Sequence, residues 1–348
     1  MLFEHTPYWK TLKPIIDSGA MEAAINGEYR YPYRINIYPG TSCMFSCLFC
    51  GRNYDAVVRG PRPNVFSQII DQDDGKDPHR INISGGLEPL TSPFINDICK
   101  DLHDKGYEAR MVTNGFMLNK KMLEKNPYIN SLDHLRVSLY GLDQDEYQAT
   151  TKHKKGWHVV KENLTKYNKR DDRTKLFLNY VLLPENFHKL DRVLEYIEDI
   201  GGISNLSLRE DFTFQYEINN RNKIQDTLMA FNEKIVATGV PVDYGYALED
   251  AMHGRQSHLV KVTHNEMTRG QSPQVKVCID PNGHIYSYME AGFVDRPGAL
   301  KHSLGNVVGS SIENELRKQV QVEPGADDIQ YMDAYNHLIQ RYIHEQRK

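Results

Sequence analysis

The chain has 348 residues and a formal net charge of −4, with 40% hydrophobic and 25% charged residues. This composition is that of an ordinary globular protein with room for about two domains, and the slight acidity excludes a global basic field that would attract nucleic acid. The start of the chain lacks the pattern of a signal peptide, and no apolar run approaches the roughly 18 residues of a membrane span. We therefore expect a cytoplasmic protein without nucleic-acid or membrane partners.

Short apolar segments typical of strands recur along the first two thirds of the chain. They occupy residues 33–38, 80–86, 108–115, 134–141, 175–183 and 204–210. Between them lie segments with helical spacing of apolar residues, such as Ile95, Ile98 and Leu102. Strand–helix alternation predicts an α/β fold with a parallel sheet covered by helices. Six repeats fit either an open doubly wound sheet or a partly closed barrel.

The pattern changes after about residue 238. The stretches "VPVDYGYAL" (240–248) and "QVKVCIDPNGHIYSYME" (274–290) are typical of strands, and Pro-Asn-Gly in the second predicts a hairpin. Helical patterns return at 302–320 and 328–343. These features predict a small C-terminal α+β appendage.

Three of the five cysteines lie in "CMFSCLFC", at Cys43, Cys47 and Cys50, directly after the first predicted strand. A [4Fe–4S] cluster held by three thiolates would leave one iron open. A zinc site would need a distant fourth ligand, and a redox pair would need only Cys47 and Cys50. Ligands of parallel sheets bind beyond the carboxyl ends of the strands, so the position of the loop favours a ligand site.

Together with three later motifs, this loop resembles the radical S-adenosylmethionine (SAM) superfamily. Phe49 occupies the aromatic position of that family's C-x3-C-x-aromatic-C motif. The later motifs are "SGGLEPL" (84–90), "TNG" (113–115) and "SLYG" (138–141), each at the end of a predicted strand. The resemblance implies a partial (β/α)6 TIM-like barrel, with Cys43, Cys47 and Cys50 as ligands of one [4Fe–4S] cluster that cleaves SAM. It also implies an electron donor such as flavodoxin or ferredoxin.

The "SGGLEPL" stretch resembles the family's Gly-Gly-Glu-Pro motif, with Leu87 inserted before Glu88. The resemblance implies that Gly85, Gly86, Glu88 and Pro89 bind the methionine part of SAM. The glycines let the backbone approach the ligand closely, and the carboxylate pairs with the amino group.

Three further polar residues at strand ends are candidates for cofactor binding. Asn114 and Ser138 suit the ribose or carboxylate of SAM, although each could instead satisfy local backbone groups. Arg209 closes the sixth predicted strand and could hold a carboxylate or phosphate, or form a salt bridge at the surface.

The resemblance also divides the chain into an N-terminal extension (1–32), a radical SAM core (33–238) and a C-terminal region (239–348). The last is similar to the SPASM or twitch modules of this superfamily but lacks their cluster-binding cysteines, since Tyr288 stands where one is expected. Strand alternation sets Cys278 apart from Val277, so the thiol is a candidate hydrogen donor to a substrate radical or a structural cysteine. Tyr286 and Tyr288 are alternative donors.

Three functions remain open at this point. The first is hydrogen abstraction from a small polar substrate such as a sugar, aminoglycoside or nucleotide sugar, with epimerisation, elimination, oxidation or carbon–carbon coupling as the outcome. The second is modification of a peptide by epimerisation or crosslinking. The third is a zinc-stabilised binding module without enzymatic activity.

Overall fold

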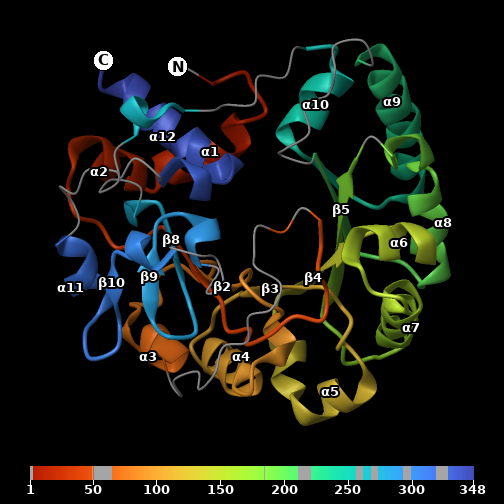
Figure 1. Ribbon diagram of the computed structural model, residues 1–348, viewed down its shortest axis with the longest axis horizontal. Coiled ribbons are helices and arrows are strands. Elements are labelled where there is room, and N and C mark those ends of the chain that lie inside the picture. The colour runs from red at the N-terminus through yellow and green to blue at the C-terminus, as the bar shows by residue number, and fades with distance from the viewer. Residues whose placement is uncertain are drawn as a thin grey trace. The chain divides into compact units, whose positions relative to one another are not determined.

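The computed structural model describes residues 3–48, 50, 65–183, 185–210, 221–255, 262–267, 273–292, 299–318 and 328–348 (Figure 1). The chain forms two compact units. One comprises residues 1–43, 51–111 and 260–348, and the other comprises residues 44–50 and 112–259. We call them the first and the second unit.

The first unit contains strands in the order β10-β9-β8-β1-β2-β3. They are β1 (Arg34–Ile37), β2 (Ile81–Ile83), β3 (Arg110–Thr113), β8 (Lys276–Ile279), β9 (His284–Tyr286) and β10 (Gly305–Asn306). Strands β8, β1, β2 and β3 run parallel, whereas β8–β9 and β9–β10 are antiparallel. The α-helices are α1 (Trp9–Asp17), α2 (Ala20–Asn26), α3 (Val65–Gln72), α4 (Ile95–Asp104), α11 (Ile312–Arg317) and α12 (Ala334–Gln346). The 3-10 turns are η1 (Pro89–Thr91), η5 (His264–Glu266), η7 (Met289–Gly292), η8 (Ala299–His302) and η9 (Asp328–Tyr331).

The second unit contains four parallel strands in the order β4-β5-β6-β7. They are β4 (His134–Leu139), β5 (Lys175–Leu182), β6 (Asn205–Glu210) and β7 (Val242–Tyr244). Its helices are α5 (Lys120–Lys125), η2 (Pro127–Ser131), α6 (Gln144–Thr151), α7 (Gly156–Asn168), η3 (Phe187–Lys189), α8 (Arg192–Asp199), α9 (Arg221–Thr238) and α10 (Tyr246–Met252). Figure 1 shows α6, α7 and α8 on one side of β4 and β5.

Strand β5 of the second unit buries one face and leaves the other partly exposed. In β5, Leu176, Leu178 and Tyr180 are buried, whereas the alternating Phe177 and Asn179 are partly exposed. Side chains of a strand alternate between the two faces, so the buried face is the one that packs against helices. The opposite face is where polar ligand-binding side chains can project.

All six expected strands are present, as β1 to β6, and the expected α/β class is confirmed. Two pairings differ from expectation. The stretch after residue 240 forms β7, which extends the second unit parallel to β6, before α10 begins at Tyr246. The expected C-terminal hairpin forms as β8–β9, but β8 also pairs parallel with β1 through Ile35 and Val277. The expected division into functional regions at residues 32 and 238 stays a prediction. The two compact units are defined by packing, which need not follow functional regions.

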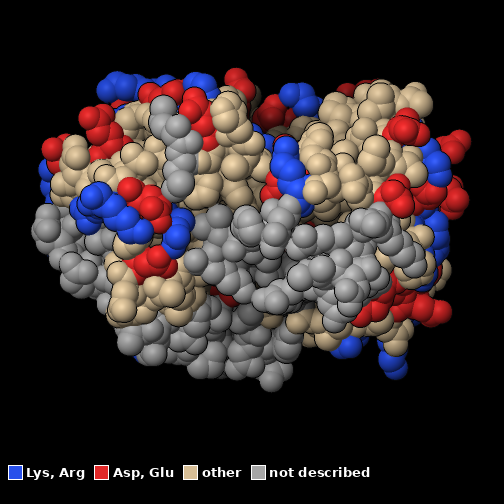
Figure 2. All heavy atoms as spheres, turned by 90° about the horizontal axis from the view of Figure 1, so that it is seen from above, with Lys and Arg blue, Asp and Glu red and all other residues tan. Residues whose placement is uncertain are grey.

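The surface agrees with the small net charge. On the face in Figure 2, Lys and Arg side chains are interspersed with Asp and Glu. Among the described residues, no helix is long and apolar enough to span a bilayer.

Candidate active site

In the first unit, the segment before the cysteines is bonded to the turn after β2. Thr91 Oγ1 accepts hydrogen bonds from the backbone N–H groups of Thr41 (2.9 Å) and Ser42 (3.1 Å) and donates to the Glu88 carbonyl (2.6 Å). The Glu88 N–H in turn donates to the Ser42 carbonyl (2.9 Å). Cys43 is the next residue after Ser42, so these bonds fix where the cysteine motif begins relative to the "SGGLEPL" turn. Sequence reasoning missed Thr91, although its hydroxyl lies only three residues after Glu88.

Glycines allow this turn to approach its neighbours closely. Gly85 and Gly86 have φ angles of +24° and +69°, and a Cβ at Gly85 would lie 2.7 Å from the Tyr38 ring. A Cβ at Gly40 would lie 2.6 Å from the carbonyl carbon of Leu87. Larger residues would therefore push the turn away from β1.

Glu88 is buried, and its carboxylate accepts a hydrogen bond from the Leu90 N–H (3.2 Å). Pro89 occupies the first position of η1 and is also buried. Proline suits this position because it has no N–H to leave unsatisfied. The inserted Leu87 is buried as well, so the insertion is accommodated inside the protein.

The cysteine loop is divided between the two units. Cys43 belongs to the first unit, whereas Cys47 and Cys50 belong to the second. The Cys50 N–H donates to the Cys47 carbonyl (3.1 Å), which places these two residues on one tight turn. Phe49 lies outside the described residues. Within the described ranges, no group of three His, Cys, Asp or Glu side chains is arranged to hold a metal ion. The cluster ligands are therefore assigned from the cysteine motif alone.

An aromatic cluster of the second unit packs around Phe45, between Cys43 and Cys47. The Phe45 ring contacts those of Phe116, Tyr140, Tyr147 and His153, with ring centroids 5.5–5.8 Å apart. Phe45 itself is buried. This packing fixes the middle of the loop against α6 and Phe116, within the second unit.

Asn114, from the "TNG" motif, also contacts this loop. Its side-chain amide lies 3.0 Å from the Met44 sulfur, and its oxygen accepts from the Phe116 N–H (2.9 Å). Asn114 is buried. The structure therefore brings one predicted cofactor residue directly against the cysteine loop.

A polar row crosses the strands of the second unit. The register aligns Ser138 of β4, Asn179 of β5, Ser207 of β6 and Asp243 of β7. Ser207 is fully buried, and its hydroxyl has no hydrogen-bond partner among the described residues. Sequence reasoning found only Ser138. The alternation of Ser207 with Leu206 and Leu208 was the available signal for the rest.

Arg209 lies on β6, two residues after Ser207, and forms an ion pair with Asp243. Its guanidinium also donates to the carbonyls of Leu208 (3.1 Å) and Asp243 (3.0 Å). Arg209 thus adopts the salt-bridge arrangement that was the alternative to ligand binding.

Cys278 lies in a buried cluster of the first unit together with Tyr38, Tyr286 and Tyr288. Its thiol is fully buried and donates to the Tyr288 carbonyl at a sulfur–oxygen distance of 3.6 Å. Burial is the main cause that raises the pKa of Cys278 to about 12. Tyr286 donates weakly to Asp280 (3.4 Å), and burial raises its pKa as well.

Comparison with known proteins assigns the family. A model described as the Radical SAM superfamily matches residues 37–197. The dTDP-4-amino-4,6-dideoxy-D-glucose ammonia-lyase of Streptomyces venezuelae is 32% identical over 359 residues, covering 95% of this chain and 74% of the relative. The chain belongs to the radical SAM superfamily.

Solved radical SAM enzymes confirm the fold. Streptococcus suis SuiB bound to precursor peptide SuiA matches with a TM-score of 0.61 at 15% identity, covering 92% of this chain and 71% of that one. The structure of anSMEcpe with bound AdoMet matches with a TM-score of 0.55 at 15% identity, covering 86% of this chain and 82% of that one. At this identity the likeness concerns the fold alone.

The cofactors of this radical SAM enzyme are a [4Fe–4S] cluster and SAM. The residues present fit both groups. Thiolates are the ligands that iron–sulfur clusters prefer, and three occur on one short loop whose last two share a turn. In the turn beside Tyr38, Gly85 and Gly86 leave no room for larger side chains and are themselves partly exposed.

The structure gives Cys278 the surroundings of a structural cysteine, and a Cys278→Ala variant separates that role from hydrogen donation. We expect the variant to keep forming the quenched product, in which the substrate radical has received a hydrogen atom. Its free energy of unfolding should fall by about 1 kcal/mol, since a small cavity opens. The measurements are product analysis and thermal unfolding. In the wild-type protein the raised pKa keeps the thiol protonated at about pH 8, so iodoacetamide should leave Cys278 unmodified. A stable variant that cleaves SAM but forms no quenched product would identify the donor instead.

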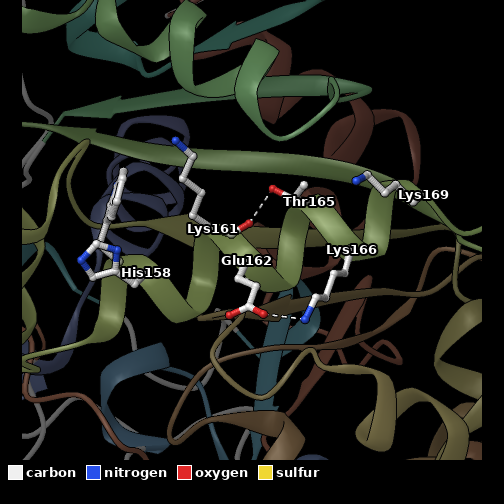
Figure 3. Close-up of a pocket in the computed structure, with 7 residues that line it drawn as sticks. His158, Lys161, Glu162, Thr165, Lys166 and Lys169 are labelled. Carbon is white, nitrogen blue, oxygen red and sulfur yellow. Dashed lines mark hydrogen bonds and ion pairs between the residues drawn. The ribbon is translucent and has the colours of Figure 1, made fainter.

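The second unit has a surface hollow on α7. It is lined by Trp157, His158, Lys161, Glu162, Thr165, Lys166 and Lys169. Figure 3 shows these side chains projecting from a single helix, with Glu162 directed toward Lys166. The hollow contains no cysteine and no residue of the superfamily motifs, so we do not assign the radical chemistry to it.

Proposed function

We propose that this radical SAM enzyme acts on an amino-deoxy sugar carried by a nucleoside diphosphate and eliminates the amino group as ammonia. The observation that carries the proposal is the 32% identity to a dTDP-amino-sugar ammonia-lyase over 95% of the chain. This substrate is a small polar molecule of the sugar type, and elimination is one of the outcomes expected for it. A location in the reducing cytoplasm, where thiolate ligands persist, belongs to the same proposal.

The proposed cluster ligands are Cys43, Cys47 and Cys50. When bound, the cluster and SAM supply one-electron reduction and a 5′-deoxyadenosyl radical that abstracts hydrogen from the substrate. Gly85, Gly86, Glu88 and Pro89 are proposed to bind the methionine part of SAM. Phe49, Asn114 and Ser138 complete the proposed cofactor set. The buried Glu88 carboxylate suits an ammonium partner because ion pairs strengthen where water is excluded.

The polar row of the second unit supports a sugar as substrate. Ser138, Asn179 and Ser207 offer hydroxyl and amide groups that both donate and accept hydrogen bonds, as sugar hydroxyls require. A buried hydroxyl without a partner costs free energy unless a ligand satisfies it, and Ser207 presents such a group among the described residues. Asp243, at the end of the row, forms an ion pair with Arg209.

The test is anaerobic incubation of the reconstituted protein with SAM, reductant and dTDP-4-amino-4,6-dideoxy-D-glucose. We expect 5′-deoxyadenosine and ammonium to appear in step, as measured by mass spectrometry and an ammonium assay. The matched substrate with a 4-hydroxyl group controls for ammonium from other sources and should release none. The proposal fails if the amino sugar does not raise 5′-deoxyadenosine above the level with SAM alone.

The peptide alternative is supported only by the fold likeness, at 15% identity. It becomes the favoured reading if the amino sugar fails in the test above. The zinc-stabilised binding module is excluded as the role of the chain, because the superfamily consists of enzymes. Radical SAM enzymes draw electrons from external reductants, and an acidic carrier such as flavodoxin or ferredoxin is the proposed donor here.

A further inference from the structure

The cysteine loop lies against the end of α6 in the second unit. The backbone N–H of Ser46 donates to the Thr151 carbonyl (2.9 Å), and that of Leu48 donates to the Thr150 carbonyl (3.0 Å). These bonds bracket Cys47, so this part of the motif is fixed to the last turn of α6. The residues directly after α6 are therefore close to the loop.

These residues are Lys152, His153, Lys154 and Lys155, and the three lysines are exposed. Leu48 is also exposed, at 63% of its surface, which makes it an apolar side chain in contact with solvent between two cysteines of the motif. We call Leu48, Lys152, Lys154 and Lys155 the lysine corner. It combines one exposed apolar side chain with three positive charges beside the cysteine loop.

The lysine corner carries positive charge that the described part of the chain does not neutralise. No carboxylate of the described residues forms an ion pair with Lys152, Lys154 or Lys155. Further along, on α7, Lys161 pairs with Asp199 (2.6 Å), and Lys166 pairs with Glu162 (Figure 3). The three lysines without a described carboxylate partner thus lie directly after α6, which is the part of this segment bonded to the cysteine loop.

The backbone of this corner is held in place and partly strained. The His153 ring packs on Phe45 and Phe116, and its Nδ1 accepts the Lys155 N–H (3.3 Å). Lys152 has a φ of +61°, a left-handed conformation that glycine or asparagine normally adopts. A lysine at such a position stands against the local preference, and strain of this kind often accompanies a functional surface.

We propose that the lysine corner is the docking surface for an acidic one-electron carrier protein that reduces the cluster. This inference rests on the proposed function of the cysteine loop. The carrier loses one electron, the cluster gains one, and no bond or proton is exchanged. Lysines without carboxylate partners attract an acidic protein and raise its rate of association, while the exposed Leu48 supplies the apolar contact of a small interface.

Binding of a purified flavodoxin tests the proposal without depending on turnover. The triple variant Lys152→Gln, Lys154→Gln, Lys155→Gln should bind it about tenfold more weakly than the wild type at low ionic strength. The difference should shrink as salt is added, because the Debye length falls from about 10 Å at 0.1 M to about 3 Å at 1 M. The matched control Lys166→Gln, Lys169→Gln, Arg173→Gln removes the same charge near the far end of α7 and should bind like the wild type.

A second arm compares two reductants in SAM cleavage by the reconstituted protein. With reduced flavodoxin, the lysine-corner variant should form 5′-deoxyadenosine about tenfold more slowly at limiting carrier, since rim charges act on association. With dithionite, which needs no docking surface, its rate should equal that of the wild type. A wild type that fails with dithionite contradicts the proposed function, and the binding comparison still decides the docking surface.

The single variant Lys152→Gly separates docking from folding. Glycine adopts the left-handed conformation without strain, so the melting temperature should stay equal or rise while flavodoxin binding weakens. Equal flavodoxin affinity of the wild type and the triple variant, or equal losses in the triple variant and its α7 control, would overturn the proposal.

Discussion

A Cys47→Ala variant is expected to lose the iron–sulfur cluster. Its rate of SAM cleavage should then fall at least about 10³-fold, which is equivalent to about 4 kcal/mol in activation free energy. Three thiolates are the minimum that holds such a cluster while leaving one iron for SAM, so removing one leaves too few ligands. The measurements are iron and sulfide per chain after anaerobic reconstitution and the rate of 5′-deoxyadenosine formation. Cys43→Ala and Cys50→Ala should behave alike.

Cys99→Ala is the matched control. Cys99 is fully buried on α4, and burial raises the pKa of its thiol, so it is a packing residue. This variant should retain iron and activity while its free energy of unfolding falls by about 1 kcal/mol. Because Cys47 is itself buried, circular dichroism must show that Cys47→Ala remains folded. A folded Cys47→Ala that keeps a full complement of iron would remove Cys47 from the ligand set.

Local pattern was enough to predict strands β1 to β9, whereas β10 (Gly305–Asn306) lies in a stretch that was expected to be helical. In "KLFLNYVLL" the apolar residues Leu176, Leu178 and Leu182 alternate with others, and β5 buries just that face. The polar motifs after β1, β2 and β3 were equally visible, because the chain places them where parallel strands end. Each of these signals spans only a few residues.

Contacts between distant segments could not be predicted in the same way. The parallel pairing of β8 with β1 joins Asn36 to Cys278, residues that no short-range pattern connects. The row from Ser138 through Asn179 to Ser207 likewise depends on the register of three strands. A shift of one residue would turn each of these side chains to the other face. Such residues become candidates only once the register is known.

The motifs of the first unit are connected by the hydroxyl of Thr91, a residue that belongs to none of the motifs. Thr91 Oγ1 accepts two backbone N–H groups from the segment before Cys43 and donates to the carbonyl of Glu88. The proposed cluster ligand and the proposed SAM ligand are thereby positioned through the same atom. Thr91 is a positioning residue, and its effect should be visible in cofactor binding.

A Thr91→Val variant keeps the shape of the side chain and removes this hydroxyl. Two N–H groups, of Thr41 and Ser42, then lose their acceptor, at about 1–3 kcal/mol for each that water does not reach. We expect SAM affinity and iron retention to fall by about 10- to 100-fold, the usual effect of losing a group that orients ligands. Equilibrium binding of SAM and iron per chain measure the two effects.

Thr91→Ser restores the hydroxyl without the methyl group and should recover most of both cofactors. A general loss of packing would instead make Thr91→Ser at least as damaging as Thr91→Val, since serine is the smaller residue. Rescue by serine therefore assigns the effect to the hydrogen bonds between residues 41–42 and 88–91. If the valine and serine variants bind SAM and iron equally well, the two motifs are positioned by the backbone contacts of Gly40 and Leu87 instead.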